Sequence, residues 1–387
     1  MKKNQLKLWA AALLVTSTLA VQSCSDSEDP INPTVPTGIG ANWDDFRGEI
    51  KSGEKVTLDA SKVYKLTGSV AVKDGGELII PAGTRIESTG GTSAYLTVEQ
   101  GGKIFANGTA TAPIVFTSPS KTPGSWGGIV IAGKAPINKG TTASAEVGNA
   151  TYGGTAVNDN SGSLSYVKIE YAGAIYTGEK EFNGLSLFGV GSGTTISNIS
   201  ILNGSDDGIE FFGGTVNVSN IVSVGNEDDA FDWTEGWNGT ATNVYTKRRE
   251  NGIGNRGIEA DNNSENNNAD PRSNPTIKNA TFIGATSGEA DAIKLRVGTY
   301  ATIDNVVLSN WSTGINVEHD ASVAYFNGGG KITNVKFDGV ATKASVKASS
   351  GSPAATLLPN TFSENANANG AGSGTATPTW AATWSGL

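Results

Sequence analysis

The residues with the clearest chemical potential are acidic and lie close together in the sequence. Carboxylates can bind Ca²⁺, which takes six to eight oxygen ligands, or they can act as general acids and bases. Between residues 206 and 235 there are eight acids and no Lys or Arg, namely Asp206, Asp207, Glu210, Glu227, Asp228, Asp229, Asp232 and Glu235. The chain has one His and one Cys, which excludes a Cys/His zinc cluster and, outside the leader, a Cys–His nucleophile pair.

The overall composition excludes several classes of protein. Lys and Arg number 28 against 37 Asp and Glu, a formal net charge of −9, which disfavours a nucleic-acid partner because phosphates are neutralised by clustered Lys and Arg. The 51 glycines among 387 residues indicate many turns without the Gly-X-Y period of collagen. A hydrophobic content of 37% suffices for a sizeable core and excludes wholesale disorder.

Residues 1–23 have the pattern of a secretory signal. Lys2, Lys3 and Lys7 precede a short apolar run that does not reach the length of a spanning helix. The segment resembles a bacterial lipoprotein signal, in which a small residue precedes a Cys that is acylated after cleavage. The resemblance implies lipidation at Cys24, and two or three acyl chains give a stable membrane anchor.

An acidic stretch follows the single cysteine and begins a tether that we place at residues 24–42. Residues 25–30 read Ser-Asp-Ser-Glu-Asp-Pro, and they resemble the export signal of surface lipoproteins in the Bacteroidota. This resemblance implies an outer-membrane protein that is lipid-anchored at Cys24 and displayed at the cell surface. An envelope transporter is one partner that such a location would allow.

Internal repeats indicate the fold. One phrase contains an Asn with apolar residues at alternating positions after it, and its clearest copies centre on Asn198, Asn279 and Asn334, with looser copies between them. A second short phrase of alternating apolar residues accompanies each copy, as in Gly208-Ile209-Glu210-Phe211. Short strands at a base period of about 22 residues, with no helix between them, predict a solenoid, with the Asn residues stacked in a turn of each coil.

The ends of the solenoid need covering, because an open sheet edge invites pairing with another chain. Residues 42–50 predict a short amphipathic capping helix with Trp43, Phe46 and Ile50 on one face. We place the solenoid at residues 43–350, with ten to twelve coils, and a Gly/Ala/Ser-rich tail at 351–387. Trp380 and Trp384 near the terminus are expected to pack back on the last coil.

The repeats resemble those of right-handed parallel β-helix proteins of the pectin-lyase-like superfamily, in particular bacterial lipoproteins of unassigned activity. The motifs that carry the resemblance include residues 101–104 with 113–117, 125–129, 166–173 and 206–214. The resemblance implies an all-β, right-handed parallel β-helix. It implies little about function, since this fold carries lyases, hydrolases, epimerases and adhesins.

Aligning the second phrase of each repeat predicts which polar residues share a face, because side chains alternate along a strand and the apolar neighbours point inward. One outward column would hold Ser186, Glu210, Asp232, Glu259, Lys294 and Asn316. The next outward column would hold Phe188, Phe212, Thr234, Asp261, Arg296 and Glu318. Stacked carboxylates about 4.8 Å apart need protons, cations or a metal, because neighbouring like charges cannot all ionise cheaply.

Three interpretations of this column remain open from the sequence. In the first, Asp207, Glu210, Asp229 and Asp232 coordinate Ca²⁺. In the second, Glu210, Asp232, Glu259 and Lys294 form a catalytic set acting on a glycan. Residues 206–209 and 293–296 resemble fragments of the polygalacturonase pattern, although the Gly-His-Gly element of that family is absent. In the third, Glu210, Asp232 and Glu259 pair with Arg256, Lys294 and Arg296 as an ion ladder.

We expect binding without catalysis as the main role of this face. The predicted ligand site is Glu210, Asp232, Glu259, Asp261, Arg296, Phe212 and Trp237, with the two aromatic rings offering flat surfaces to a sugar. The sign of the charge argues against acidic polymers and favours a neutral sugar, a cationic ligand or a metal complex. A polysaccharide lyase or glycoside hydrolase is the alternative, and a structural or adhesive stalk is the second alternative.

Overall fold

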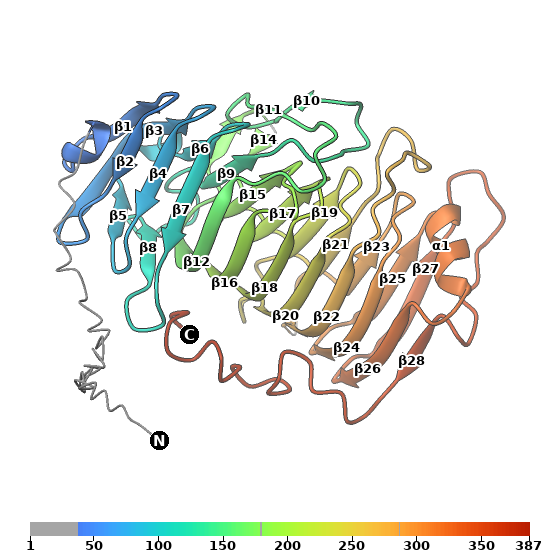
Figure 1. The fold of residues 1–387 in the computed structure, drawn as a ribbon. Coiled ribbons are helices and arrows are strands. Elements are labelled where there is room, and N and C mark those ends of the chain that lie inside the picture. The colour runs from blue at the N-terminus through green and yellow to red at the C-terminus, as the bar shows by residue number, and fades with distance from the viewer. Residues whose placement is uncertain (1–37, 179, 286) are drawn as a thin grey trace, which may run out of the picture. The chain divides into compact units, whose positions relative to one another are not determined.

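A computed structural model of the protein describes residues 38–387 apart from residues 179 and 286. The expected signal peptide, Cys24 and most of the expected tether lie outside the described residues. The described part is almost entirely β-structure, wound into successive coils that stack side by side (Figure 1). No helix in this part is both long enough and apolar enough to cross a bilayer.

Each coil contributes to three parallel sheets, which we number 1 to 3. Sheet 1 carries the predicted site, and its strands pair in register from one coil to the next. Its members are β1 (Phe46–Ile50), the second half of β3 (Val63–Val72), β6 (Leu96–Val98), β9 (Ile129–Ala132), β15 (Leu185–Phe188), β17 (Ile209–Phe212), β19 (Phe231–Thr234), β21 (Ile258–Ala260), β23 (Asp291–Leu295), β25 (Thr313–Glu318) and β27 (Thr342–Lys347).

Sheets 2 and 3 share long strands that bend at a corner. Sheet 2 begins with β2 (Lys55–Thr57), β4 (Glu77–Ile80) and β7 (Lys103–Asn107), and sheet 3 begins with the first half of β3, β5 (Arg85–Ser88) and β8 (Ile114–Thr117). Both continue through β12 (Gly162–Glu170), β16 (Thr195–Leu202), β18 (Asn217–Val224), β20 (Thr240–Lys247), β22 (Thr276–Ile283), β24 (Thr302–Ser309), β26 (Ile332–Asp338) and β28 (Phe362–Glu364).

The corner between sheets 2 and 3 explains the repeated asparagine. From Asn198 to Asn334, each Asn at this corner has a left-handed backbone with φ between 55° and 59°, a conformation that Asn tolerates better than most residues. The side chains form a ladder in which Asn243 donates to Asn220 at 2.8 Å and accepts from Asn279 at 3.1 Å. The predicted stacking of these residues is confirmed.

The core fills the space between the three sheets. Inward side chains such as Ile209, Phe211 and Trp233 are fully buried and belong to one continuous apolar cluster along the solenoid. The right-handed parallel β-helix expected from the sequence is therefore confirmed, with eleven strands in sheet 1 within the described residues. The last paired strand, β28, lies beyond residue 350, where we had expected the solenoid to end.

The predicted capping helix at residues 42–50 is wrong. Residues 46–50 form strand β1, which pairs in parallel with β3, because Phe46 and Ile50 are four residues apart and satisfy the period of a strand as well as that of a helix. Gly48 has φ of 120°, which a helix does not allow, and Trp43 stays 40% exposed. The first coil is flanked instead by a 3₁₀ turn, η1 (Gly38–Ala41), whose Ile39 packs against the core.

The remaining elements are short and lie outside the three sheets. Two antiparallel hairpins are formed by β10 (Ala143–Ser144) with β11 (Thr151–Tyr152) and by β13 (Ile175–Thr177) with β14 (Lys180–Glu181). The helices are the 3₁₀ turn η2 (Gly91–Ser93) and α1 (Asp320–Asn327), which follows β25. These insertions leave the coils through the turns, so the sheets themselves stay regular.

The C-terminal segment returns along the outer side of sheet 3 toward earlier coils (Figure 1). Two solenoid residues donate hydrogen bonds to carbonyls of this segment. Thr281 donates to Gly374, and Ser200, in an earlier coil, donates to Ser385. Trp384 packs edge-on against Tyr166 of β12. The two tryptophans therefore do pack back on the solenoid, but on its middle coils and not on the last coil as expected.

Candidate functional site

The outward column of sheet 1 has the predicted register. Strand pairing aligns Glu210 with Ser186 on one side and with Asp232 on the other. Asp232 aligns in turn with Glu259, and Glu259 aligns with Lys294. This alignment follows from the inward neighbours, because Phe231 and Trp233 are fully buried in the core and leave Asp232 on the outer side.

Seven carboxylates gather around this column and form what we call the acidic cluster. They fall into three overlapping groups, each with one oxygen per residue within 4.8 Å of the others. The groups are Asp206, Asp207 and Asp228; Asp207, Glu210 and Asp232; and Asp229, Asp232 and Glu259. The four residues predicted to bind a metal are therefore all in the cluster, and their oxygen-only donor set is the one that Ca²⁺ prefers.

Within the part of the chain that the structure describes, the middle group has no positively charged partner. Glu210 accepts a hydrogen bond from the Nδ2 of Asn183 at 2.7 Å, and Asp207 accepts one from the backbone N–H of Asp229 at 2.8 Å. Among the described residues, no hydrogen-bond donor or cation pairs with the carboxylate of Asp232. Three acids that share one small volume without a Lys or Arg must carry protons or a cation.

Burial is the main cause of the pKa shifts in the cluster. It raises the pKa of Asp206 and of Asp229 to about 8, with the charges of neighbouring acids adding to the effect. Burial likewise raises the pKa values of Asp207, Glu210 and Asp232 well above their ordinary values, and again nearby carboxylates contribute. Uncharged carboxyls or bound cations are therefore favoured over free carboxylates at neutral pH.

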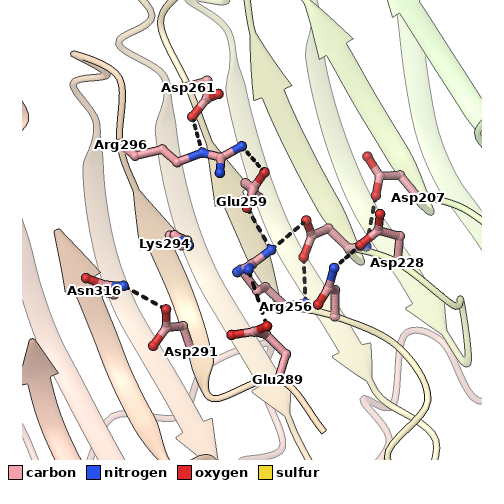
Figure 2. Close-up of polar contacts among 12 residues, drawn as sticks. Asp207, Asp228, Arg256, Glu259, Asp261, Glu289, Asp291, Lys294, Arg296 and Asn316 are labelled. Atoms are coloured by element: carbon pink, nitrogen blue, oxygen red, sulfur yellow. Dashed lines mark hydrogen bonds and ion pairs between the residues drawn. The ribbon is translucent and has the colours of Figure 1, made fainter. Parts of the chain in front are cut away.

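The other half of the column is an ion network, as Figure 2 shows. The guanidinium of Arg256 lies 2.7 Å from Glu259 and 3.5 Å from both Asp229 and Glu289. Arg296 pairs with Glu259 and also lies 2.8 Å from Asp261. The ion-ladder interpretation thus fits Glu259, and Asp261, which it did not include, joins the same network. The described residues offer no such pairing to Glu210 or Asp232.

Lys294 belongs to the same network at its far end. Its ammonium lies 3.5 Å from the carboxylate of Glu318, and Asn316 donates hydrogen bonds to Asp291 at 2.7 Å and to Glu318 at 3.0 Å. These side chains are mostly buried, so the positive charges are compensated within the protein. The column therefore changes from unpaired acids around Asp232 to balanced pairs beyond Glu259.

A loop that the repeats do not predict covers one side of the acidic cluster. Tyr152 of β11 donates a hydrogen bond to Glu235, and Lys139 lies 3.0 Å from the same carboxylate. The proximity of Glu146 further raises the pKa of Glu210. A cavity of about 60 Å³ lies beside Lys139 and Glu235. Lys139, Glu146 and Tyr152 were missed because residues 133–160 interrupt the repeat, and only the length of that interruption marks them in the sequence.

The predicted aromatic platform is not present. Trp237 is 0% exposed and stacks on Phe211 in the core at 3.9 Å between ring centroids. Phe212 is 6% exposed and stacks on Phe188 at 4.0 Å, in an apolar cluster that also contains Tyr152. The expectation of exposed rings is wrong because the loop at residues 133–160 covers Phe212, while the Trp237 side chain turns inward after β19 ends.

Comparison with known proteins identifies the family to which the chain is similar. The family model described as a pectate-lyase-like β-helix domain matches residues 48–385, and no curated protein matches the chain. Among solved structures, the Dettilon tailspike protein is similar at 11% identity and a TM-score of 0.31, over 76% of this chain and 61% of that one. The enzymatically active domain of bacteriophage CBA120 tailspike protein 2 is similar at 13% identity and a TM-score of 0.21, over 77% of this chain and 42% of that one.

This chain thus spans only part of the length of either tailspike. The family match, in contrast, covers nearly the whole described solenoid, from β1 to the C-terminal segment. The chain belongs to the family of pectate-lyase-like β-helix domains.

Proposed function

We propose that this protein is a cell-envelope lipoprotein whose sheet 1 binds a glycan without cleaving it, with a divalent cation held in the acidic cluster. The observation that carries the proposal is the group of Asp207, Glu210 and Asp232, whose oxygens lie within 4.8 Å of one another and have no Lys or Arg partner among the described residues. Calcium is the cation that suits an all-oxygen donor set. Its bound form would present a positive centre to hydroxyl groups of a ligand.

The ligand expected from the charge is neutral. Acidic side chains dominate one half of the outward column, and the cations of the other half, Arg256 and Arg296, are engaged by carboxylates. An anionic polymer would meet repulsion from the cluster, because like charges at close range are costly. A neutral sugar or a cationic ligand fits better, and tight binding of polygalacturonate without added cation would contradict this choice.

The direct test is binding of neutral glycans on an array with and without Ca²⁺. We expect Ca²⁺ to add to the binding and this Ca²⁺-dependent part to be lost in Asp232→Asn, while Asp44→Asn, an exposed acid in the first coil, behaves like the unmodified protein. Equal binding in EDTA would refute the role of the cation. Absence of any glycan binding would favour the alternative of a structural or adhesive stalk.

A second candidate is a glycoside hydrolase or lyase that uses the same face. The observation in its favour is the contrast between neighbouring rungs. Burial raises the pKa of both Asp232 and Glu259, but two arginines oppose the shift at Glu259, whereas among the described residues Asp232 has no such partner. Neighbouring carboxyls whose surroundings separate their pKa values are the arrangement of an acid/base pair. Reducing-end release from a neutral polysaccharide that stops in Asp232→Asn and in Glu259→Gln would favour this function over binding alone.

The location is proposed from the leader, with a lipid on Cys24 and display at the outer surface of the outer membrane. Incorporation of labelled palmitate into the protein in cells, absent from Cys24→Ser, would test the anchor. Digestion of intact cells with an external protease would test the surface location, and co-purification with an integral envelope protein would test for a transporter partner.

A further inference from the structure

A groove of about 630 Å³ lies on the outer side of sheet 3, away from the acidic cluster. This volume falls within the range of small-molecule sites, which is about 300–1,000 Å³. Strand pairing brings Lys247, Ile283, Ser309 and Asp338 to equivalent positions on β20, β22, β24 and β26. Four rungs at a strand spacing of about 4.8 Å make a floor about 14 Å long.

The walls of the groove come from distant parts of the chain. Asn310 in the turn after β24 forms part of one side, and Thr375 of the returning C-terminal segment lies on the other. The segment is held beside the groove by Thr281, which donates to the carbonyl of Gly374 at 2.9 Å. The C-terminal segment therefore contributes part of the wall of the groove.

Several polar groups in the groove lack a protein partner. Ser309 is only 4% exposed, and among the described residues its hydroxyl makes no hydrogen bond. The side chains of Asn310 and Asp338 are likewise without a partner within the described part of the chain. A nearly buried hydroxyl that faces a cavity without a partner is costly unless water or a ligand supplies the hydrogen bond.

The chemistry of the lining indicates the class of ligand. Ser309 and Asn310 can both donate and accept, Asp338 accepts, and Ile283, on the rung next to Ser309, adds an apolar surface. The ammonium of Lys247 lies 3.4 Å from Glu250, so the carboxylate of Asp338 leaves the groove with a net negative charge that disfavours anions. A pyranose ring presents hydroxyls that donate and accept together with an apolar C–H face, which matches this set.

We propose that the groove on sheet 3 is a saccharide-binding site for a neutral sugar, separate from the acidic cluster and independent of divalent cations. The sugar lies along the four rungs from Lys247 to Asp338, with its hydroxyls bonded to Ser309, Asn310 and Asp338 and its apolar face on Ile283. This second site goes beyond the function proposed for sheet 1, because none of its residues belongs to the acidic cluster and it needs no cation.

The test is saturation-transfer NMR on the full protein in EDTA, with maltose, cellobiose and lactose as probes. We expect transfer to at least one of the three sugars. Asp338→Ala and Ser309→Ala should each weaken its binding at least about fivefold, since each removes a hydrogen bond that contributes about 1 kcal/mol. Ser309→Phe, whose ring would occupy the groove, should abolish transfer.

The controls separate this site from sheet 1. Asp232→Asn should bind the sugar as the unmodified protein does, so failure of the sheet 1 proposal leaves this result intact. If Ser309→Phe alters the circular dichroism spectrum, Asp338→Ala remains decisive, because Asp338 is exposed and its side chain has no partner in the described residues. No transfer to any of the three sugars, or transfer unchanged in Asp338→Ala and Ser309→Ala, would overturn the proposal.

Discussion

At the scale of single residues, Asp232 is the group on which the account of sheet 1 depends. It belongs to two of the three carboxylate groups in the acidic cluster, and among the described residues its charge has no partner. Glu259, one rung away, is held by Arg256 and Arg296. Burial raises the pKa of both acids, but arginines oppose the shift only at Glu259, so two acids in register on adjacent strands differ in their partners in a way that can be measured.

The first prediction concerns pH in the absence of metal. The raised pKa values of Asp206 and Asp229, about 8, lie above the unfolded value of about 3.9, so between these values the native state binds more protons than the unfolded state. Stability must then fall as pH rises, by about 1.4 kcal/mol per pH unit for each such carboxyl. Thermal unfolding in EDTA from pH 5 to pH 8 should show a falling midpoint, and a constant or rising midpoint would contradict the shifts.

A second residue-scale prediction concerns Arg256. Its loss would leave Asp229, which is 3% exposed, and Glu259 without the guanidinium that they share. Breaking a buried ion pair from one side costs about 3–5 kcal/mol, so Arg256→Ala should lower the urea midpoint strongly. Arg47→Ala is the matched control, because its pair with Asp45 is well exposed and contributes about 0–1 kcal/mol. Equal effects of the two substitutions would show that the network is solvated.

At the scale of elements, the asparagine ladder joins consecutive coils at one corner. Asn243 has φ of 59° and makes hydrogen bonds to both Asn220 and Asn279. Asn243→Ala should cost about 2–4 kcal/mol, since it loses two hydrogen bonds and must place a β-carbon in a left-handed conformation. Asn243→Gly should cost less, because Gly adopts the left-handed backbone conformation without strain and the variant loses only the two hydrogen bonds. Urea unfolding of both variants tests this order, and a larger loss in the Gly variant would contradict it.

The strands and their register could be predicted because each repeat has the same alternation of apolar and polar residues. In the second phrase, apolar residues on both sides of Glu210, Asp232 and Glu259 fix those acids on the outer side, and one register slip would expose Phe231 and Trp233. Local apolar spacing does not predict the structure of residues 42–50, because it fits a helix as well as a strand. The pairing of β1 with β3 determines that a strand forms.

Contacts between distant segments could not be predicted in this way. Nothing near Tyr152 in the sequence shows that its hydroxyl meets Glu235, because the contact depends on how a loop of nearly thirty residues folds back over β19. For Trp237 the sequence indicated an aromatic near the acidic face, but the direction of its side chain is set by packing against Phe211. The acidic column is formed by the repeated strands and could be predicted from them, whereas the loop that covers it is an insertion between the repeats.

At the scale of the whole described solenoid, the C-terminal segment links coils far apart in the sequence. Trp384 is 2% exposed and packs against Tyr166, while Ala381 covers Val222 in a small apolar cluster. Trp384→Ala should release the end of the segment without unfolding the coils, because each coil is stabilised mainly by its neighbours. Limited proteolysis should then cut near the C-terminus while the circular dichroism spectrum stays unchanged; resistance equal to that of the unmodified protein would contradict an anchoring role.

The most direct test of the central claim is thermal unfolding of the purified protein at pH 7.5, first in EDTA and then in millimolar Ca²⁺. A cation that binds only the native state at 100 times its dissociation constant adds about 2.7 kcal/mol, so the midpoint should rise in the unmodified protein and in Asp44→Asn. It should not rise in the double variant Glu210→Gln/Asp232→Asn, which keeps the shape of the site but removes two charges. No rise in the unmodified protein, or an equal rise in the double variant, would contradict a cation site in the acidic cluster.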